Sequence, residues 1–480
     1  MTTQVTTVRP RWRRIVRRIA IGIVGLFLIA LVANAVWGYV EASHLQAEIH
    51  RIKAAGEPLT FKDLDARPPK MDEADDAGPY YDAALALLRH KDPQSRKLWD
   101  AYSTYSDSMR QSPTSRPSKE VCEIVDRFLA DNTLTLQMLD LAAQRPACRF
   151  KVGVEAGFQH MKSYSRMRAM AKLLSLQALI RASAGRPDEA ADSVVCLLRM
   201  LRMFDQQPIV IAHLVKMAIA SMACLDAKTV LETARPTDAK LALLQEALLA
   251  TDTPRPLEPV ILAERVYGIE LFGPILADSV AAEETANLPS GSYEPLSNGF
   301  WVRYTSTGVV GFTSGQWQST GFWVRPMARH MVMGYLREMS AMLGDARRPL
   351  PEVLSTIQSG GQAASIFGAT VAPALGRGMI FSERAIAEIR CAAVAIMIER
   401  YRRATGHLPQ SLHDLIPKYA PSLPIDPFTG KELVYHRDEK SYVVYSLGED
   451  QKDDNGYVER GKDNKGPLDF GCRIRLPAGR

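Results

Sequence analysis

The strongest pattern along the chain is an uninterrupted apolar run close to the N-terminus. Residues Ile19 to Val40, IAIGIVGLFLIALVANAVWGYV, contain no charged side chain. A helix of this length spans roughly 33 Å, enough to cross the hydrocarbon core of a bilayer. Apolar residues then recur at helical spacing up to Gly56, so residues 41–76 are predicted to hold a helical extension and a polar connector.

Residues 77–284 are predicted to form a helical domain. The clearest part is a helical hairpin at 163–205, in which Gly185 ends one helix and Pro187 opens the next. This hairpin resembles a tetratricopeptide unit, because Ala178, Gly185 and Ala190 occupy the small-residue positions of that repeat. No 34-residue period follows, which favours a bundle of helical hairpins over a repeat array.

The helical pattern breaks at residues 285–325. Within it, the stretch 298–325 holds seven aromatic residues, including Trp301, Trp317 and Trp323, punctuated by Gly, Ser and Thr. This composition predicts a long loop or an irregular hairpin. The aromatic rings would stack on sugars or line a cleft, or alternatively pack on the helical body or touch the membrane surface. Residues 326–358 again have a helical pattern, and the small residues of 359–378 predict a linker.

Residues 379–480 are predicted to form a small α+β domain. An apolar stripe that includes Ile386, Ile389 and Ile396 predicts a long helix ended by Gly406. ELVYHR and SYVVYSLG alternate as two strands around a polar turn. The expected fold class is therefore mainly α, with an N-terminal transmembrane helix, an extracytoplasmic bundle of helical hairpins and this small α+β domain.

Charge supports a membrane anchor and argues against nucleic-acid binding. The net charge is +6, but residues 1–18 hold six arginines and no acid, and the other 53 basic and 53 acidic residues balance. The arginines are Arg9, Arg11, Arg13, Arg14, Arg17 and Arg18. A basic tail of this kind stays in the cytoplasm. We therefore expect a single-pass protein of the cytoplasmic (inner) membrane with its bulk outside the cytoplasm. The alternative is a signal peptide cleaved near ANA, residues 33–35.

The sequence contains no recognisable catalytic motif. It lacks a P-loop, a G-x-S-x-G elbow and an H-E-x-x-H helix, so the protein is expected not to be an enzyme. His160 stands alone on a predicted helix, and Glu264 and Arg265 are expected to form at most an ion pair. The six cysteines have no C-x-x-C spacing; either one or two disulfides or buried free thiols fit them.

The C-terminal region resembles the globular head of the major pseudopilins of type II secretion systems. The resemblance covers about 383–470 and rests on four phrases in order: the end of a long helix, a short helix, a Pro-rich crossing and a strand. The matching residues are Tyr401, Arg402, Thr405, Gly406 and Pro409; Leu412, Leu415 and Pro417; Pro424, Asp426, Pro427 and Phe428; and Tyr442, Val444, Ser446, Leu447, Gly448 and Asp450.

The chain departs from pseudopilins at its start. No Gly-[Phe/Met]-x-x-x-Glu processing site precedes Ile19, so we do not expect it to be processed and packed as an ordinary pilin subunit. Its layout as a whole resembles that of large single-pass membrane-anchored bacterial proteins that carry a pilin-type head.

The resemblance implies a structural calcium site in the acidic loop after the last matched strand. By position it assigns the Leu447 carbonyl, Asp450 and, more loosely, Asp469 as ligands. Asp453, Asp454 and Asn455 supply further oxygen donors of the kind that calcium prefers. The alternative is an acidic loop that is simply solvated.

Two functions from different classes follow from the sequence. The first is a non-enzymatic, membrane-anchored envelope scaffold, linked by the resemblance to secretion or pseudopilus assembly and to envelope or secretion-system partners. The second is an exported hydrolase or carbohydrate-binding protein that uses the aromatic residues of 300–323. A Ser-His pair or converging carboxylates beneath that segment would favour the second function.

Overall fold

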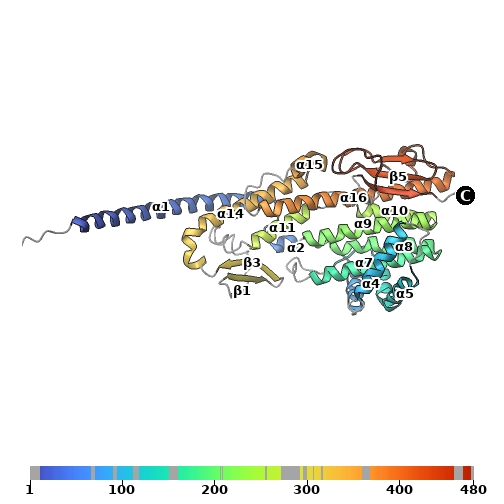
Figure 1. Cartoon of the computed structure of the whole chain (residues 1–480), viewed down its shortest axis with the longest axis horizontal. Helices are drawn as coiled ribbons and strands as arrows, with labels where there is room; N and C mark the ends of the chain where they lie inside the picture. The colour runs from blue at the N-terminus through green and yellow to red at the C-terminus, as the bar shows by residue number, and fades with distance from the viewer. Residues whose placement is uncertain are drawn as a thin grey trace, which may run out of the picture.

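The computed structural model describes residues 11–65, 71–89, 95–111, 118–150, 161–205, 207, 209–253, 257–271, 292–295, 300–305, 308–314, 317–358, 368–458 and 469–476. Within these residues the chain is mostly helical, with two three-stranded antiparallel sheets (Figure 1). The predicted class, mainly α with a long apolar N-terminal helix and a small C-terminal sheet, is confirmed at this level.

The N-terminal helix α1 (Arg11–Ala54) projects from one end of the molecule (Figure 1). As predicted, it continues past the apolar run and ends just before Gly56, whose φ of +67° favours glycine. Leu45, Ile49 and Ile52 are buried against the body. A short helix α2 (Phe61–Asp65) and the 3₁₀ turn η1 (Glu73–Asp75) follow.

The body is built from consecutive helices that pack in pairs. The α7–α8 hairpin forms as predicted: Gly185 has a φ of +72°, Pro187 opens α8, and Asp188 and Glu189 lie in its first turn. The helices are α3 (Gly78–Leu87), α4 (Ser95–Gln111), α5 (Lys119–Asp131), α6 (Thr133–Ala143), α7 (Met161–Ser183), α8 (Pro187–Met200), η3 (Leu201–Phe204), α9 (Val210–Thr233), α10 (Asp238–Thr251) and α11 (Glu258–Leu271).

The segment 285–325, predicted to be a loop or irregular hairpin, contains regular structure. Strands β1 (Ser292–Pro295), β2 (Phe300–Thr305) and β3 (Gly308–Ser314) pair in that order, with a register shift between Arg303 and Tyr304. Helix α14 (Trp317–Ala346) begins well before 326, and α15 (Leu350–Gln358) follows it. Among the described residues, Thr305, Gly308 and Thr313, which suggested a loop, lie within these strands, and Ser319 and Thr320 lie in the first turn of α14.

Helix α16 (Gly368–Thr405) also begins earlier than expected, inside the stretch 359–378 predicted to be a linker. Its first turns are rich in small residues, but Leu375 and Met379 are buried in a cluster with α14, and this packing supports the helix. It ends before Gly406, which has a φ of +83°. The short helix η4 (Leu412–Leu415) and the sheet β4 (Val434–Arg437), β5 (Ser441–Ser446) and β6 (Phe470–Arg475) complete the chain.

Helix α16 is packed on two sides. Helices α9 and α10 lie against one side, and strands β5 and β6 lie against the other (Figure 1). One hydrophobic cluster therefore runs from Tyr81 in α3 through Leu173 in α7 and Ile396 in α16 to Tyr442 in β5. The C-terminal sheet shares this core with the helical body, and each fully buried Leu or Ile in it contributes about 1.5–3 kcal/mol.

Two helices in the described part of the chain are long and apolar enough to cross a membrane. One is α1 from Ile15 onward, whose apolar window has no buried residue, and the other is α9, whose window is half buried. Because α9 lies between α7, α8 and α16, we interpret it as a core helix. The exposed window of α1 is consistent with a membrane anchor or a signal sequence.

Two chemical expectations are settled by the packing. All six cysteines are free thiols and five of them are buried, which decides against the disulfide alternative in this structure. Arg265 forms an ion pair with Glu57 at 2.7 Å, whereas Glu264 accepts a hydrogen bond from the Val210 amide. The ion pair considered for Glu264 and Arg265 is thus replaced by one that joins the end of α1 to α11. His160 lies outside the described residues.

Candidate metal centre

The Pro-rich crossing is fixed to strand β5 by one buried carboxylate. Asp426 is 1% exposed and accepts hydrogen bonds from four donors. These are the Phe428 amide (2.9 Å), the Thr429 hydroxyl (3.0 Å), the Ser446 hydroxyl (2.6 Å) and the Leu447 amide (3.2 Å). Asp426 therefore organises the backbone on which the acidic loop begins. The sequence showed it only as part of a motif; its position between two Pro residues was the available signal.

The loop after β5 is tightly turned. Gly448, Gln451, Asn455 and Gly456 all have φ between +55° and +70°. This conformation is uncommon for Gln, and the Gln451 side chain is held by a hydrogen bond to the Phe428 carbonyl at 2.7 Å. A Cβ at Gly456 would lie 3.0 Å from side-chain carbons of Val443 and Tyr445, so the loop packs closely on the sheet.

The six residues assigned by sequence fall into two groups. Asp450 is exposed and accepts a hydrogen bond from the Lys452 amide, close to Leu447 at the start of the loop. Asp453, Asp454, Asn455 and Asp469 lie at its other end, where Gly456 links them: the Gly456 amide donates to Asp469 Oδ2 at 3.0 Å. Asp453 Oδ1 accepts from the Tyr445 hydroxyl and the Asn455 amide at 2.7 and 2.8 Å.

Two carboxylate oxygens in the second group are buried, and neither has a hydrogen-bond partner among the residues that the structure describes. They are Oδ2 of Asp454 and Oδ1 of Asp469. Asp469 has no exposed surface. Burial, together with the charges of Asp454 and Asp453, raises the pKa of Asp469 to about 6 against the lowering effect of the Gly456 and Asp454 amides. A buried carboxylate oxygen without a donor is costly, and either a proton or a cation relieves that cost.

The donor set fits a hard cation such as calcium. Calcium takes six to eight oxygen ligands, and it accepts backbone carbonyls and waters beside a few carboxylates. Asp454 and Asp469 present free oxygens, and Asp453 carries its charge nearby. Within the described residues no three His, Cys, Asp or Glu side chains are gathered as a metal-binding group, so a cation here would take further oxygens from the backbone or from water.

One buried Ser-His contact bears on the hydrolase alternative. His213 Nε2 of α9 lies 2.6 Å from Ser382 Oγ of α16, and the Ser382 hydroxyl donates to the Gly378 carbonyl at 2.9 Å. Burial lowers the pKa of His213 to about 4, so the ring is neutral at pH 7. The geometry therefore makes the imidazole N–H the donor and the serine oxygen the acceptor. That arrangement joins two helices and is the reverse of what activates a serine nucleophile.

A cleft of about 350 Å³ lies at the α5–α6–α7 side of the body. Its polar lining includes Asp140, Gln177, Arg181 and Arg186. Arg181 donates to Ser193 Oγ at 2.7 Å, and both arginines pair with Glu189 at 3.2–3.5 Å. Burial raises the pKa of Asp140. The lining thus combines a partly buried acid with two arginines that are held in place by their partner.

Comparisons of the chain with protein-family models, with curated proteins and with solved structures found no match. The pseudopilin resemblance consequently rests on the sequence phrases given above, and the functional argument that follows depends on the geometry.

Proposed function

We propose that the protein is a non-enzymatic scaffold of the bacterial envelope, held in the inner membrane by α1 and stabilised at its opposite end by calcium. The observation that carries this proposal is the contrast between the two ends. At one end α1 presents an apolar 18-residue window in which no residue is buried, and at the other end two buried carboxylate oxygens have no donor among the described residues.

The membrane arm of the proposal rests on exposure and charge. Leu26 and Ile29 are 73% and 70% exposed, values that a soluble surface would not tolerate over a whole helix face. Arg17 and Arg18 lie just before this run, which favours a cytoplasmic N-terminus and an extracytoplasmic body. Protease added to intact spheroplasts should therefore degrade the body; protection of the body in intact spheroplasts would contradict the orientation.

The scaffold arm rests on the shape of the helical body. The cleft at α5–α6–α7 combines apolar side chains with arginines already positioned, which suits a protein segment as a partner. The resemblance to pseudopilins suggests partners from a secretion or pseudopilus assembly. The inverted Ser382–His213 contact supports a non-enzymatic assignment, because its proton lies on the wrong atom for nucleophilic attack.

Calcium is the part of the proposal that one experiment tests directly. The full chain in detergent micelles should bind calcium in calorimetry and melt at a higher temperature in calcium than in chelator. A ligand that binds only the folded state stabilises it by about 2.7 kcal/mol at a hundredfold excess over its Kd. The double variant Asp454→Asn/Asp469→Asn should lose both effects.

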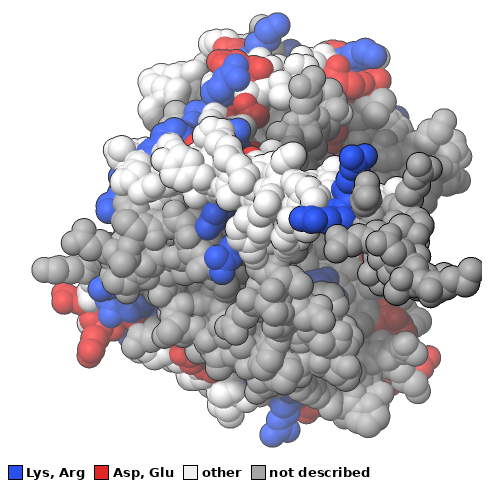
Figure 2. Space-filling model, turned by 90° about the vertical axis from the view of Figure 1, so that its left-hand side faces the viewer, with Lys and Arg blue, Asp and Glu red and all other residues white. Residues whose placement is uncertain are grey.

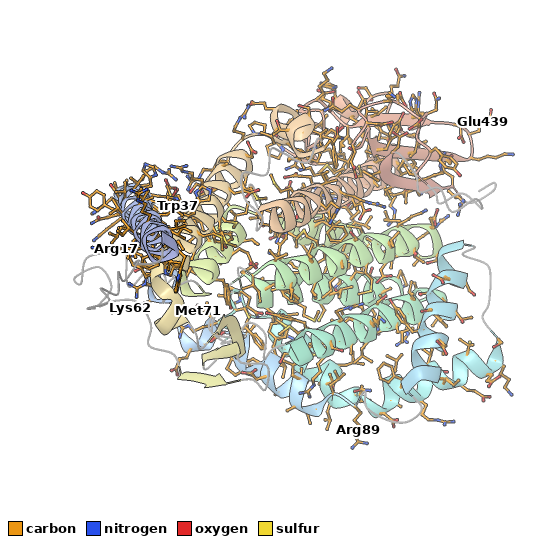
Figure 3. All side chains as sticks on the ribbon, turned by 60° about the vertical axis from the view of Figure 1, so that its left-hand side comes forward. Arg17, Trp37, Lys62, Met71, Arg89 and Glu439 are labelled. Atoms are coloured by element: carbon orange, nitrogen blue, oxygen red, sulfur yellow. The ribbon has the colours of Figure 1, made fainter. Side chains whose placement is uncertain are left out.

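The matched control is Glu439→Gln. Glu439 is an exposed carboxylate in the β4–β5 turn of the same sheet, far from Arg17 and Trp37 of α1 (Figure 3). This variant should keep the full calcium response. An equal response in the double variant, or no response in the unaltered chain, would remove calcium from the proposal and leave the loop as a solvated surface.

A further inference from the structure

Helices α1 and α14 run parallel and remain in contact along much of their length (Figure 1). Beyond the apolar run the contacts are polar: Ser340 to Glu48 at 3.2 Å and His330 Nδ1 to Glu41 at 3.1 Å. At its end, the Arg329 guanidinium donates to the Gly38 carbonyl at 2.9 Å. The contact then continues into the apolar run itself.

Inside the apolar run, one hydrogen bond pairs a polar group of α1 with a polar group of α14. Pro326 lies within α14 and has no N–H, so the carbonyl of Phe322, four residues earlier, loses its helical partner. Asn34 is the one side chain of the apolar run with a strongly polar group. Its Nδ2 donates to that carbonyl at 2.6 Å. Each group thereby satisfies the other, as polar groups in hydrocarbon must be satisfied.

The side chains around this hydrogen bond are apolar and exposed. Phe322, Trp323 and Met327 are 43%, 44% and 51% exposed, whereas Pro326 is buried against Gly38. The Trp323 ring lies 5.8 Å from the Phe27 ring of α1 and 5.4 Å from the Phe322 ring. The exposed apolar surface of α1 thus extends onto α14. Figure 2 looks onto this end of the molecule and shows uncharged side chains in the middle of the face.

The depth of this surface follows from the rise of α1. Asn34 precedes Val40 by six residues and Phe27 precedes it by thirteen, which places them roughly 9 Å and roughly 20 Å inside the end of the run. The boundary between the apolar run and the polar contacts lies at Glu41, Arg329 and His330. Trp37, labelled in Figure 3, lies one helical turn before Glu41, on the apolar side of this boundary. Arg325 precedes Pro326 at the level of Gly38, within reach of the headgroups for a long side chain.

We propose that the part of α14 that holds Phe322, Trp323 and Met327 inserts beside α1 into the bilayer leaflet nearest the folded body, with lipid acyl chains covering these three side chains. This inference rests on the proposed anchoring of α1. It adds a second attachment that does not span the membrane. Two side-by-side attachments fix the rotation of the body about α1, and one helix alone leaves that rotation free.

Depth-dependent quenching in lipid nanodiscs tests the proposal on the full chain. A fluorophore is attached to a cysteine introduced at Trp323 or Met327, with Leu26→Cys in α1 and the 58% exposed Leu134→Cys in α6 as references. The quenchers are phosphatidylcholines that carry a nitroxide either on the headgroup or along the acyl chain. The unaltered chain, with five of its six thiols buried, gives the background labelling.

We expect the quenching by each nitroxide to depend on how deep the labelled position lies in the bilayer. Acyl-chain nitroxide should quench position 26 most and position 323 several-fold more than position 134. Position 327 should respond better to the headgroup nitroxide. Quenching at 26 with none at 323 would overturn the insertion and leave the anchor standing. Absence of quenching at 26 as well would contradict the anchor itself.

The alternative is that a second copy of the chain, instead of lipid, covers Phe322, Trp323 and Met327. If so, position 323 would be shielded from lipid nitroxide and from aqueous iodide alike, and the nanodiscs would hold dimers by mass. That outcome would also overturn the proposal.

Discussion

The two longest helices in the described part of the chain, α1 and α16, each contain a long apolar stretch, and the two stretches have opposite surroundings. In α16 almost every side chain from Ala385 to Ile398 is buried between α9, α10 and the sheet. In α1 the side chains from Ile19 to Ile29 are almost all exposed, and α14 lies against the part nearest the body.

The difference between them lies in where charge is placed. Helix α16 carries charges within and directly after its apolar stretch that have fixed partners in the body: Arg390 pairs with Asp252 at 2.8 Å, and Arg400 pairs with Asp238 of α10 at 2.9 Å. The apolar run of α1 contains no charge at all. A helix in a protein core can carry charges, because neighbouring elements supply partners of opposite charge. Lipid acyl chains offer no such partners, so charges on a helix surrounded by lipid are costly.

The largest effect is expected from placing one carboxylate in each stretch. Ala393→Asp introduces a charge at a site of α16 with no exposed surface, and its cost of several kcal/mol is comparable to the whole stability of a domain. The folded state should be lost in thermal melts of the detergent-solubilised chain. Leu26→Asp should leave the melt unchanged and instead reduce the fraction that floats with liposomes. Equal melts for both variants would break the comparison.

The joint between α1 and the body gives the next largest effect. Arg265 is completely buried, and Glu57 holds it at 2.7 Å. Burial raises the pKa of Glu57, but hydrogen bonds from Arg265 and Arg347 outweigh it and lower the pKa overall. Glu57→Gln leaves a buried guanidinium unpaired and should cost about 3–5 kcal/mol in unfolding free energy.

The control for this joint is Glu352→Gln, which removes a surface pair with Arg348 at 3.3 Å. Its cost should stay below about 1 kcal/mol. Because the pKa of Glu57 is lowered in the folded state, its contribution is present at neutral pH and disappears as the pH falls through the folded pKa. Denaturant titrations at pH 7 and in acid check both statements, and a small loss for Glu57→Gln would contradict the first.

The sheet that covers α16 should respond to pH through Asp469. Its folded pKa of about 6 lies above the ordinary value near 4, so the folded state holds the proton more tightly than the unfolded chain. Without calcium, the contribution of Asp469 to stability should be fully present below about pH 4 and should be lost as the pH rises through about 6. Asp469→Asn should flatten this profile and gain about 1–2 kcal/mol at pH 7 in chelator.

Calcium should remove the same pH dependence, because a bound cation holds the carboxylate in its ionised form. Thermal melts between pH 4 and 7, with calcium and with chelator, give the measurement. Glu439→Gln should keep the pH profile of the unaltered chain. A flat profile in chelator for the unaltered chain would show that Asp469 ionises normally.

The smallest effect is expected at the hydrogen bond between Asn34 of α1 and the Phe322 carbonyl of α14. Asn34→Leu leaves the Phe322 carbonyl unpaired, and Pro326→Ala restores a backbone N–H to that carbonyl. The loss caused by Asn34→Leu should therefore shrink in the Pro326→Ala background, with a coupling of about 0.5–1 kcal/mol. The measurement is the melting temperature of the chain in lipid nanodiscs. Additive effects of the two substitutions would show that Asn34 does not compensate for the N–H that Pro326 lacks.

Local signals in the sequence were sufficient for much of the fold. Gly56, Gly185 and Gly406 each mark a helix end with positive φ, and Pro187 marks a start, because these residues act through their own backbone. The aromatic and β-branched residues of SYVVYS were sufficient for β5. The starts of α14 and α16 were missed, because their Gly, Ser, Thr and Ala residues carry little helical signal of their own; in α16, Leu375 and Met379 are buried by packing with α14.

Long-range pairs could not be derived from the sequence. Asn34 and Phe322 are 288 residues apart, and Glu57 and Arg265 are 208 apart. At the candidate metal centre the acidic composition was visible in the sequence. The separation of exposed Asp450 from buried Asp469 was not, because it depends on how the loop turns back onto β5 and β6.

Because α16 lies late in the sequence, its position also determines when during synthesis the core of the body is completed. Helices α9 and α10 are synthesised long before α16, yet their apolar faces are covered only when α16 arrives. The body therefore has no finished core while the ribosome is still making the last quarter of the protein. In the proposed extracytoplasmic orientation this delay is useful, because a body without a finished core can still pass unfolded through a narrow translocation channel.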